Sequence, residues 1–307
     1  KKKITTMRLL TALSIILGLS HSVAAQQLMV SSLYDQHGYL HNPSVVGVAQ
    51  KSMVGASHRS MWSGIEGSPQ TTLLFGSTSV QGGRVGLGGY LYSDVTGPTK
   101  RTGLQTAYAY HVPVKKDAFF SVGLEARFQQ FSLDKSFLQA SLGSDPVLAA
   151  SENRIKGDAG LGISYTAKNW QLGASVSQLI QTKLDFYSGN LSRSEEARLY
   201  RHFYLHGNYV WQVDDATRII PNLLLVYLPN APTELQAGMR VEHKELLWWG
   251  LSLRARQSWM LSAGVKLQNK FVIGYCFDIY STPLSVFDKG ANAHEIVLRY
   301  DFIKRKS

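Results

Sequence analysis

Cysteine is almost absent from this chain of 307 residues, which contains only Cys276. A single cysteine cannot form an internal disulfide, and none follows the first apolar stretch, where a lipid anchor would be attached. Long apolar runs are absent too, because beyond residue 25 no stretch of 18 apolar residues occurs. A membrane-spanning helix needs about 20 such residues, so a helical membrane protein is excluded.

Catalytic motifs are missing as well. The chain has neither the Gly-x-Ser-x-Gly turn of serine hydrolases nor a phosphate-binding loop. The nine histidines are scattered, and His202 and His206 fall on an expected strand rather than on one face of a helix, where they could hold a metal together. Only a chance encounter of Ser252 or Ser262 with His206 would give an esterase pair. We therefore expect no enzyme activity, no metal and no cofactor.

Acidic residues are outnumbered, with 21 against 32 lysines and arginines, so the formal net charge is +11. Four of the positive charges lie in the first 25 residues. No basic cluster is interleaved with aromatic residues, which argues against a nucleic-acid partner. Anionic lipid or an acidic partner fits this moderate basicity better.

The N-terminus has the layout of a secretory signal peptide. A basic start is followed by a short apolar core at residues 9–19 and by the small residues 23–25, which place cleavage before Gln26. A buried N-terminal helix is the alternative interpretation.

Residues 292–302 carry the clearest structural pattern in the chain. One face of an extended strand would hold His294, Ile296, Leu298, Tyr300 and Phe302, and the other would hold Glu295, Val297, Arg299 and Asp301. Because side chains alternate between the faces of a strand, one face is mainly apolar and the other carries charge. The same alternation returns along most of the chain, with aromatic residues near strand ends. This is typical of a transmembrane β-barrel, with lipid outside and a polar lumen inside.

About fourteen such strands are expected, and single-chain bacterial barrels have an even number. They cover residues 50–59, 69–79, 84–92, 103–112, 118–130, 153–166, 169–180, 198–211, 218–228, 232–243, 246–256, 258–268, 270–280 and 292–302. Every second connection is short, whereas 131–152, 181–197 and 281–291 are long; two others on that side, at 229–231 and near Gln257, are short. We therefore predict an all-β fold, a transmembrane antiparallel β-barrel with short periplasmic turns and longer external loops.

The inward faces of these strands carry charges of both signs, which can pair across strands and fill the lumen. They are Glu125, Arg127, Lys156, Asp158, Arg240, Glu242, Arg254, Lys266, Asp278, Glu295, Arg299 and Asp301. This argues against a wide diffusion pore. The strand at 218–228 is ambiguous because it would turn Leu224 and Val226 inward. The aromatic residues expected at the membrane interface are Tyr108, Tyr110, Tyr209, Trp211, Trp248 and Trp249.

The expected organisation has four parts. They are a signal peptide at 1–25, a periplasmic N-terminal segment at 26–49, the outer-membrane barrel at 50–302 and a basic periplasmic tail at 303–307. The segment at 26–49 contains His37, His41, Asn42 and Pro43, does not alternate, and is expected to be coil with a helical turn. Its expected role is to dock periplasmic partners, and the alternative is a plug that stabilises the barrel.

Two motifs stand near the ends of the mature chain. The first joins an Asn-Pro element, a basic strand end with a tryptophan, and Gly-Ile-x-Gly-x-Pro-x-Thr; the second is His-Glu-Ile in the closing strand. Their residues, which we take as candidates for interaction, are Asn42, Pro43, His58, Arg59, Trp62, Gly64, Ile65, Gly67, Pro69, His294, Glu295 and Phe302. This combination resembles the PorP/SprF family. Ser44, Val45 and Met61 depart from the usual family pattern and leave the subfamily open.

The resemblance implies a non-enzymatic outer-membrane component of the type IX secretion system of Bacteroidota, tied in some members to gliding motility. The partners it implies are the periplasmic ring lipoprotein and its partner protein, the inner-membrane motor and, in some members, the C-terminal domain of secreted cargo. Two other functions stay open: an outer-membrane channel for small or hydrophobic solutes, and a barrel enzyme. A channel predicts a continuous lumen, whereas a connector predicts a lumen closed by side chains or by residues 26–49.

Overall fold

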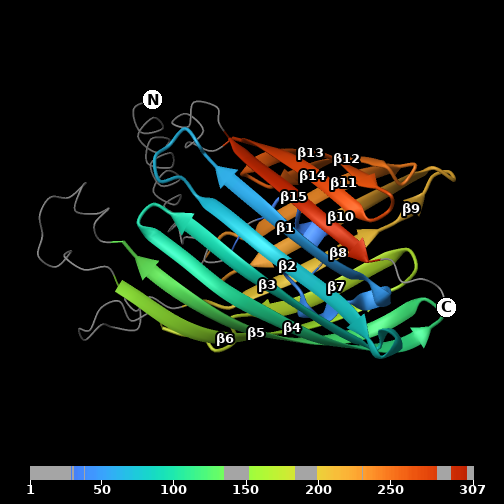
Figure 1. Ribbon diagram of the computed structural model, residues 1–307, viewed down its shortest axis with the longest axis horizontal. Coiled ribbons are helices and arrows are strands. Elements are labelled where there is room, and N and C mark those ends of the chain that lie inside the picture. The colour runs from blue at the N-terminus through green and yellow to red at the C-terminus, as the bar shows by residue number, and fades with distance from the viewer. Residues whose placement is uncertain are drawn as a thin grey trace, which may run out of the picture.

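The computed structural model describes residues 29, 31–37, 39–134, 152–183, 199–229, 231–281 and 292–302. These residues form one closed antiparallel sheet, in which β11 pairs with both β12 and β10 (Figure 1). Of its 15 strand elements, β8 and β9 are two pieces of one strand that is interrupted at Val210, since both pair with β10. The barrel therefore has 14 strands, which confirms the predicted fold class.

The strands have the following bounds: β1 Ser52–Met61, β2 Gln70–Val80, β3 Val85–Thr96, β4 Thr99–Lys115, β5 Ala118–Leu133, β6 Glu152–Thr166, β7 Trp170–Ser177, β8 His202–Tyr209, β9 Trp211–Gln212, β10 Thr217–Tyr227, β11 Glu234–His243, β12 Leu247–Arg254, β13 Ser258–Leu267, β14 Phe271–Tyr280 and β15 Ala293–Phe302. Three short helical elements, α2 Tyr34–His37, η1 Pro43–Val45 and η2 Val48–Gln50, precede the first strand, and η3 Gln81–Gly83 lies between β2 and β3. None of the helices in the described ranges is long and apolar enough to cross a membrane.

The main difference from the expected strands is the length of β3 and β4. They continue to the two-residue turn at Gly97 and Pro98, and residues 93–96 pair with 99–102. These residues are mostly polar on both faces, so the alternation that marked the rest of each strand is missing there. The three long loops expected at 131–152, 181–197 and 281–291 fall mainly outside the described residues, as do the signal peptide and the basic tail.

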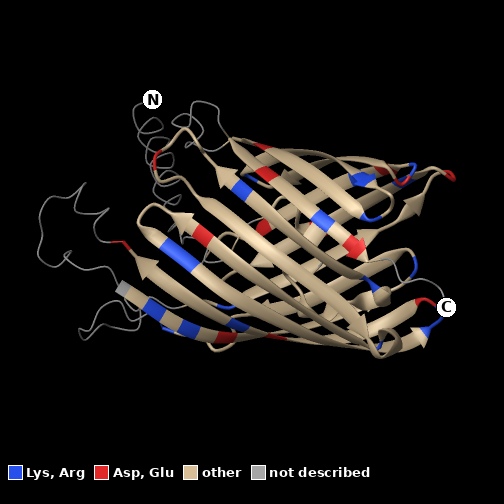
Figure 2. Cartoon of the chain, viewed as in Figure 1, with Lys and Arg blue, Asp and Glu red and all other residues tan. Residues whose placement is uncertain are grey.

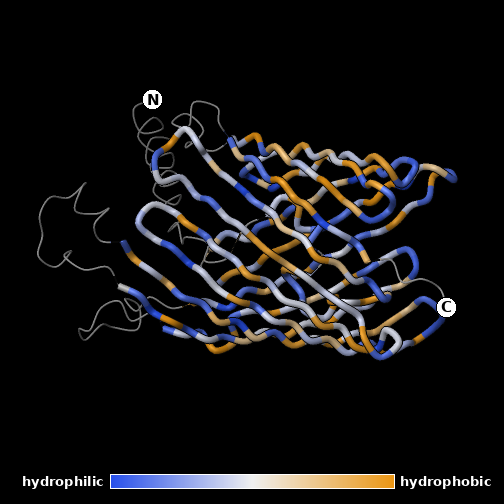
Figure 3. Tube along the Cα trace, viewed as in Figure 1, coloured by the Kyte–Doolittle hydropathy of each residue, from blue (hydrophilic) through white to orange (hydrophobic). Residues whose placement is uncertain are grey.

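The outer face of the barrel is apolar, as the alternation predicted, and Figure 3 shows hydrophobic and hydrophilic residues alternating along many of the strands. In β15, Ile296 and Leu298 are about half exposed, whereas Glu295 and Val297, which precede them, are buried. The assigned faces of β11, β12 and β14 follow the same rule. Arg256 is an exception, because it lies in the turn after β12 with a positive φ of 63° and is exposed.

The two ends of the barrel differ. We call the end that carries the β2–β3, β4–β5, β6–β7, β9–β10, β11–β12 and β13–β14 connections the short-turn end, and the opposite end the long-loop end. One short turn is built around Asp214, whose carboxylate accepts hydrogen bonds from the backbone N–H groups of Ala216 and Thr217, both at 2.7 Å. These bonds lower the pKa of the Asp214 carboxyl, the Ala216 bond contributing most.

Residues 31–37 and 39–50, which we call the plug, lie inside the barrel (Figure 1). Just before the plug, Met29 lies beside Leu228 and Pro232 at the long-loop end. At its other end, Gln50 donates a hydrogen bond to the carbonyl oxygen of Gly82 in the β2–β3 turn, at 3.3 Å. The described part of the segment 26–49 thus runs through the lumen.

The interior contains an apolar core as well as charges. Plug residues Leu33, Tyr39 and Val46 are at most 2% exposed and pack with inward residues of the wall. The ambiguous Leu224 is buried on the inward face, as it lines cavities of the lumen. Trp248 is buried in this core and not at the membrane interface, so its assignment to the aromatic belt was wrong. The other five aromatic residues assigned to the belt are exposed: Tyr108, Tyr110, Tyr209, Trp211 and Trp249.

Candidate functional site

The plug fits against the barrel wall through glycines. A Cβ atom added at Gly86 would lie 1.8 Å from the carbonyl oxygen of Val46, and one at Gly162 would lie 2.0 Å from Oδ1 of Asn42. A Cβ at Gly123 would come equally close to the plug backbone, at 2.3 Å. No carbon atom fits at such distances, so the backbone of β3, β5 and β6 approaches the plug as closely as only glycine allows.

Asn42 anchors the middle of the plug. Its side-chain oxygen accepts hydrogen bonds from the backbone N–H and hydroxyl of Ser44, at 2.9 and 2.7 Å, and so caps η1, which begins at Pro43. Its amide nitrogen donates to the carbonyl oxygens of Ile163 in β6 and Ala174 in β7, at 3.1 and 3.3 Å. The Asn-Pro element of the first motif is therefore buried between the plug and the wall.

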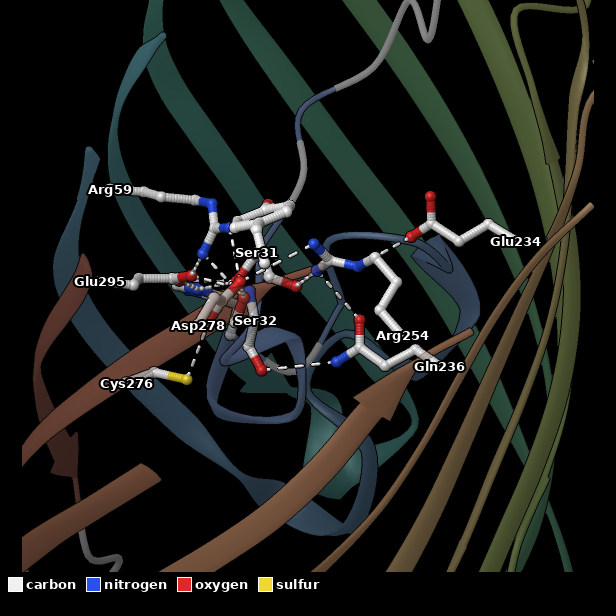
Figure 4. A network of polar contacts seen from close by, with 11 residues as sticks. Ser31, Ser32, Arg59, Glu234, Gln236, Arg254, Cys276, Asp278 and Glu295 are labelled. Atoms are coloured by element: carbon white, nitrogen blue, oxygen red, sulfur yellow. Dashed lines mark hydrogen bonds and ion pairs between the residues drawn. The ribbon is translucent and has the colours of Figure 1, made fainter. Parts of the chain in front are cut away.

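Arg59 and Glu295, one from each motif, meet inside the barrel (Figure 4). They face each other on the paired strands β1 and β15, and their side chains approach to 3.3 Å. Arg59 also donates to Asp278 on β14 at 2.7 Å and to the hydroxyl of Tyr280 at 3.1 Å. The guanidinium is 1% exposed, so its charge is compensated by buried carboxylates instead of water.

The first residues of the plug bind this same group (Figure 4). Ser31 donates its hydroxyl hydrogen to Glu295 at 2.7 Å, and Ser32 donates its backbone N–H to the other oxygen of Glu295 at 2.7 Å. The hydroxyl of Ser32 donates to Asp278, also at 2.7 Å. On the other side, Arg254 donates to the carbonyl oxygen of Ser31 at 3.5 Å. The plug is thus held by charged groups of three strands, β12, β14 and β15.

A second polar group lies on the wall formed by β3 to β5. Arg127 and Glu125 form an ion pair at 2.7 Å, and Gln105 bridges them by donating to Glu125 at 2.8 Å and accepting from Arg127 at 2.9 Å. Tyr92 donates to Gln129 beside them at 2.8 Å. Pairing of inward charges across and along strands, as the sequence predicted, is therefore present on both sides of the lumen.

The remaining residues of the first motif lie outside the lumen. The β1–β2 connection at the long-loop end contains Trp62, Gly64, Ile65, Gly67 and Pro69. The indole of Trp62 packs on Tyr280 with ring centroids 5.3 Å apart, and the carbonyl oxygen of Gly67 accepts from Gly97 in the β3–β4 turn at 2.7 Å. Gly67 has a φ of +70°, which favours glycine there. These contacts shape the loop and are separate from the Arg59 group, except through Tyr280.

His58, His294 and Phe302 are also apart from the lumen site, because they point outward. His58 lies 2.9 Å from the hydroxyl of Thr72, and His294 lies 2.6 Å from that of Tyr275. Phe302 is the last residue of β15 and is 52% exposed. Of the twelve candidate residues, the structure therefore brings together Arg59 and Glu295, which lie on wall strands and bind the start of the plug. Asn42 and Pro43 lie further along the plug.

A cavity of about 650 Å³ lies on the short-turn side of the plug, and we call it the vestibule. Its wall includes the β6–β7, β11–β12 and β13–β14 turns, and plug residues 34–36 and 40–42 line its inner side. Three ion-paired arginines face it, Arg218, Arg240 and Arg299, with Glu242, Asp35 and Asp301 as their partners. The described residues hold no group of three or more His, Cys, Asp or Glu arranged to bind a metal.

Sequence reasoning missed the residues that hold the plug in place, Ser31 and Ser32 above all. Small polar residues in an irregular segment carry no periodic signal, and their partners Asp278 and Glu295 lie more than 240 residues away. A usable signal was present in the wall, where glycines occupy inward positions on consecutive strands. Inward glycines in a barrel indicate that another part of the backbone lies close to the wall.

Comparisons with known proteins agree with these features. A sequence model of the family described as "Type IX secretion system membrane protein PorP/SprF" matches residues 23–300. No curated protein matches the chain. Among solved structures, the chain is similar to the Ralstonia pickettii toluene transporter TbuX, with 11% identity and a TM-score of 0.52 over 86% of this chain and 92% of that one.

Two further structures give weaker superpositions. The TodX deltaS2S3 mutant, a monoaromatic hydrocarbon channel, has 9% identity and a TM-score of 0.49 over 85% of this chain and 92% of its own. The Acinetobacter baumannii outer membrane protein Omp33 has 9% identity and a TM-score of 0.46 over 84% and 100%. At such low identity, only the fold is compared. The chain is an outer-membrane β-barrel.

Proposed function

Because the chain belongs to the PorP/SprF family of type IX secretion system membrane proteins, we propose that it serves secretion as a closed barrel that works through protein contacts. Its partners in this proposal are the periplasmic ring lipoprotein and its partner protein, the motor, and the C-terminal domain of secreted cargo. The chain itself supplies no enzyme activity and needs no cofactor.

The observation that supports a connector is the plug. The plug crosses the lumen from the long-loop end to the short-turn end and is bound to the wall on several strands. The glycine contacts leave no gap between the plug backbone and β3, β5 or β6. A channel for solutes would need this segment to leave, and its hydrogen bonds to the wall would then have to be exchanged for bonds to water.

Two measurements test the proposal together. In a strain that lacks the protein, cargo with type IX signals should stay in the cell while other outer-membrane proteins assemble normally. The purified barrel in planar bilayers should conduct little, and a variant in which a flexible linker replaces residues 30–46 should conduct more. Large, steady conductance steps from the unmodified barrel would favour a channel for solutes. Normal secretion in the strain that lacks the protein would contradict the proposed role in secretion.

The linker variant also separates docking from plugging. If the plug only fills the barrel, this variant is less stable but still co-purifies with periplasmic partners. If the plug itself is the docking element, a properly inserted variant loses those partners and secretion fails.

A further inference from the structure

The vestibule faces the periplasm in the orientation that barrels of this class adopt, with short turns on the periplasmic side. Its volume of about 650 Å³ is within the range of ligand-binding pockets, about 300–1,000 Å³. The plug separates it from the long-loop end. Any molecule that enters it therefore comes from the periplasm and leaves the same way.

The charges that line the vestibule do not balance. Six basic residues line it, Lys51, Lys168, Arg218, Arg240, Lys266 and Arg299, against four acidic ones, Asp35, Glu242, Glu245 and Asp301. Three of these acids, Asp35, Glu242 and Asp301, are already engaged by arginines, and Glu245 lies in the exposed β11–β12 turn. Arg299 holds both carboxylate oxygens of Asp301, at 2.7 and 3.0 Å, and Glu242 lies between Arg218 and Arg240 at 2.8 and 3.1 Å.

Three lysines line the cavity, Lys51, Lys168 and Lys266, and none of them forms an ion pair within the described residues; Lys168 lies in the exposed β6–β7 turn. Lys51 lies just before β1, and Lys266 lies on the inward face of β13; neither forms an ion pair or side-chain hydrogen bond within the described ranges. Arg299 is rigidly placed, because it also donates to the backbone carbonyl of Gln36 in the plug, at 2.7 Å. A ligand with two or more carboxylates would therefore find two free ammonium groups beside a fixed guanidinium.

Charge continues beyond the cavity. Outside the vestibule, the described part of the short-turn end carries five further basic residues, Arg84, Lys115, Lys116, Lys244 and Lys270, against three further acidic ones, Asp117, Asp214 and Asp215. Figure 2 shows Lys and Arg in blue and Asp and Glu in red at the short-turn end of the barrel, on the right in this view. An acidic chain that approaches the short-turn end would therefore be attracted before it reaches the vestibule.

We propose that the vestibule binds an acidic peptide segment of a periplasmic partner, with carboxylates on Lys51 and Lys266. A lipid headgroup does not fit this site, because the cavity lies inside the barrel and the wall separates it from the bilayer. The proposal rests on the proposed function, in that it supplies the contact through which a periplasmic protein of the secretion system would engage the plugged barrel.

The test uses the full-length barrel in nanodiscs and a fluorescent ten-residue peptide of alternating glutamate and glycine, with glutamine replacing glutamate in the reference peptide. Fluorescence anisotropy should show binding of the glutamate peptide only, and the affinity should fall as salt rises. Joint replacement by Lys51→Gln and Lys266→Gln should weaken binding about tenfold, whereas Lys51→Arg with Lys266→Arg should retain it.

The matched control is the pair Lys116→Gln and Lys270→Gln, which removes the same charge from the same end but outside the vestibule. It should change the affinity less than twofold. An equal loss in both pairs, or displacement of the peptide by free glutamate at the same concentration, would overturn the proposal. These binding results do not depend on secretion, so they distinguish a wrong site from a wrong function.

Discussion

Arg59 connects the first strand of the barrel, β1, with the last two strands, β14 and β15, and with the plug. Its guanidinium contacts Asp278 and Glu295, and those two carboxylates bind Ser31 and Ser32 in turn. A buried charge is tolerated only when it is paired and hydrogen-bonded, so each member of this group depends on the others. The same contacts that neutralise the charges therefore fix the position of the plug.

Replacing Arg59 should be costly for this reason. Within the described residues, Arg59→Met leaves only the more distant Arg254, at 3.8 Å, to pair with Asp278 and only His37, at 3.3 Å, to pair with Glu295, and we expect the free energy of unfolding to fall by about 3–5 kcal/mol. Unfolding in urea from lipid vesicles measures this. The control is Arg84→Met, because Arg84 is exposed in the β2–β3 turn and should be nearly neutral. Equal effects of the two substitutions would contradict the role assigned to Arg59.

Substitution of Gly162 tests how closely the plug packs against β6. A methyl group there would meet Oδ1 of Asn42 at 2.0 Å and Pro43 at 3.0 Å, so Gly162→Ala should destabilise the protein by about 1–3 kcal/mol. Gly76→Ala is the matched control, since its nearest neighbour would lie 3.6 Å away. Protease sensitivity of the plug should rise only in the first variant. No difference between them would mean that the plug does not lie against β6.

At the scale of elements, the strands could be predicted because each carries its own signal. Lipid on one side and packed lumen on the other impose alternation on nearly every strand, and β15 shows it over its whole length. The plug could not be placed in this way. Leu33 and Val46 pack against residues from many strands, and no local pattern in the sequence records such contacts. The polar ends of β3 and β4 were missed because they extend past the region where lipid selects apolar side chains.

Substitutions on the outward faces of the strands can show where along the barrel the bilayer midplane lies. Leu251 lies midway along β12 and Val114 lies near the end of β4, and both are about half exposed to the outside. Arginine on the lipid face costs about 2–4 kcal/mol at the bilayer midplane and about 0–1 near the interface. We therefore expect Leu251→Arg to lower the free energy of unfolding clearly more than Val114→Arg does. The reverse order would place the membrane elsewhere on the barrel.

The whole molecule is asymmetric around its axis. The strands β4, β5 and β6 have 17, 16 and 15 residues, whereas β12 on the opposite side has 8, and about 9–11 suffice to cross a bilayer. Much of the extra length lies toward the long-loop end, where β4 and β6 begin and β5 ends (Figure 1). The strands β4, β5 and β6 thus extend the barrel at the long-loop end, the vestibule lies at the short-turn end, and the plug lies between them.

Whether this closed arrangement is the working state can be tested by locking the plug. A Cβ added at Gly88 would lie 2.5 Å from Cγ2 of Val46 and 2.8 Å from Cζ of Tyr39, whose ring has to shift to admit it; with that shift, the pair Val46→Cys and Gly88→Cys should form a disulfide in a Cys276→Ser background. Because the proposed connector acts with its lumen closed, oxidised protein should secrete cargo as well as reduced protein and should conduct as little. The two single-cysteine variants control for the substitutions themselves. If oxidation stops secretion and a reductant restores it, then the plug has to move during secretion, and a closed lumen is only the resting state of the barrel.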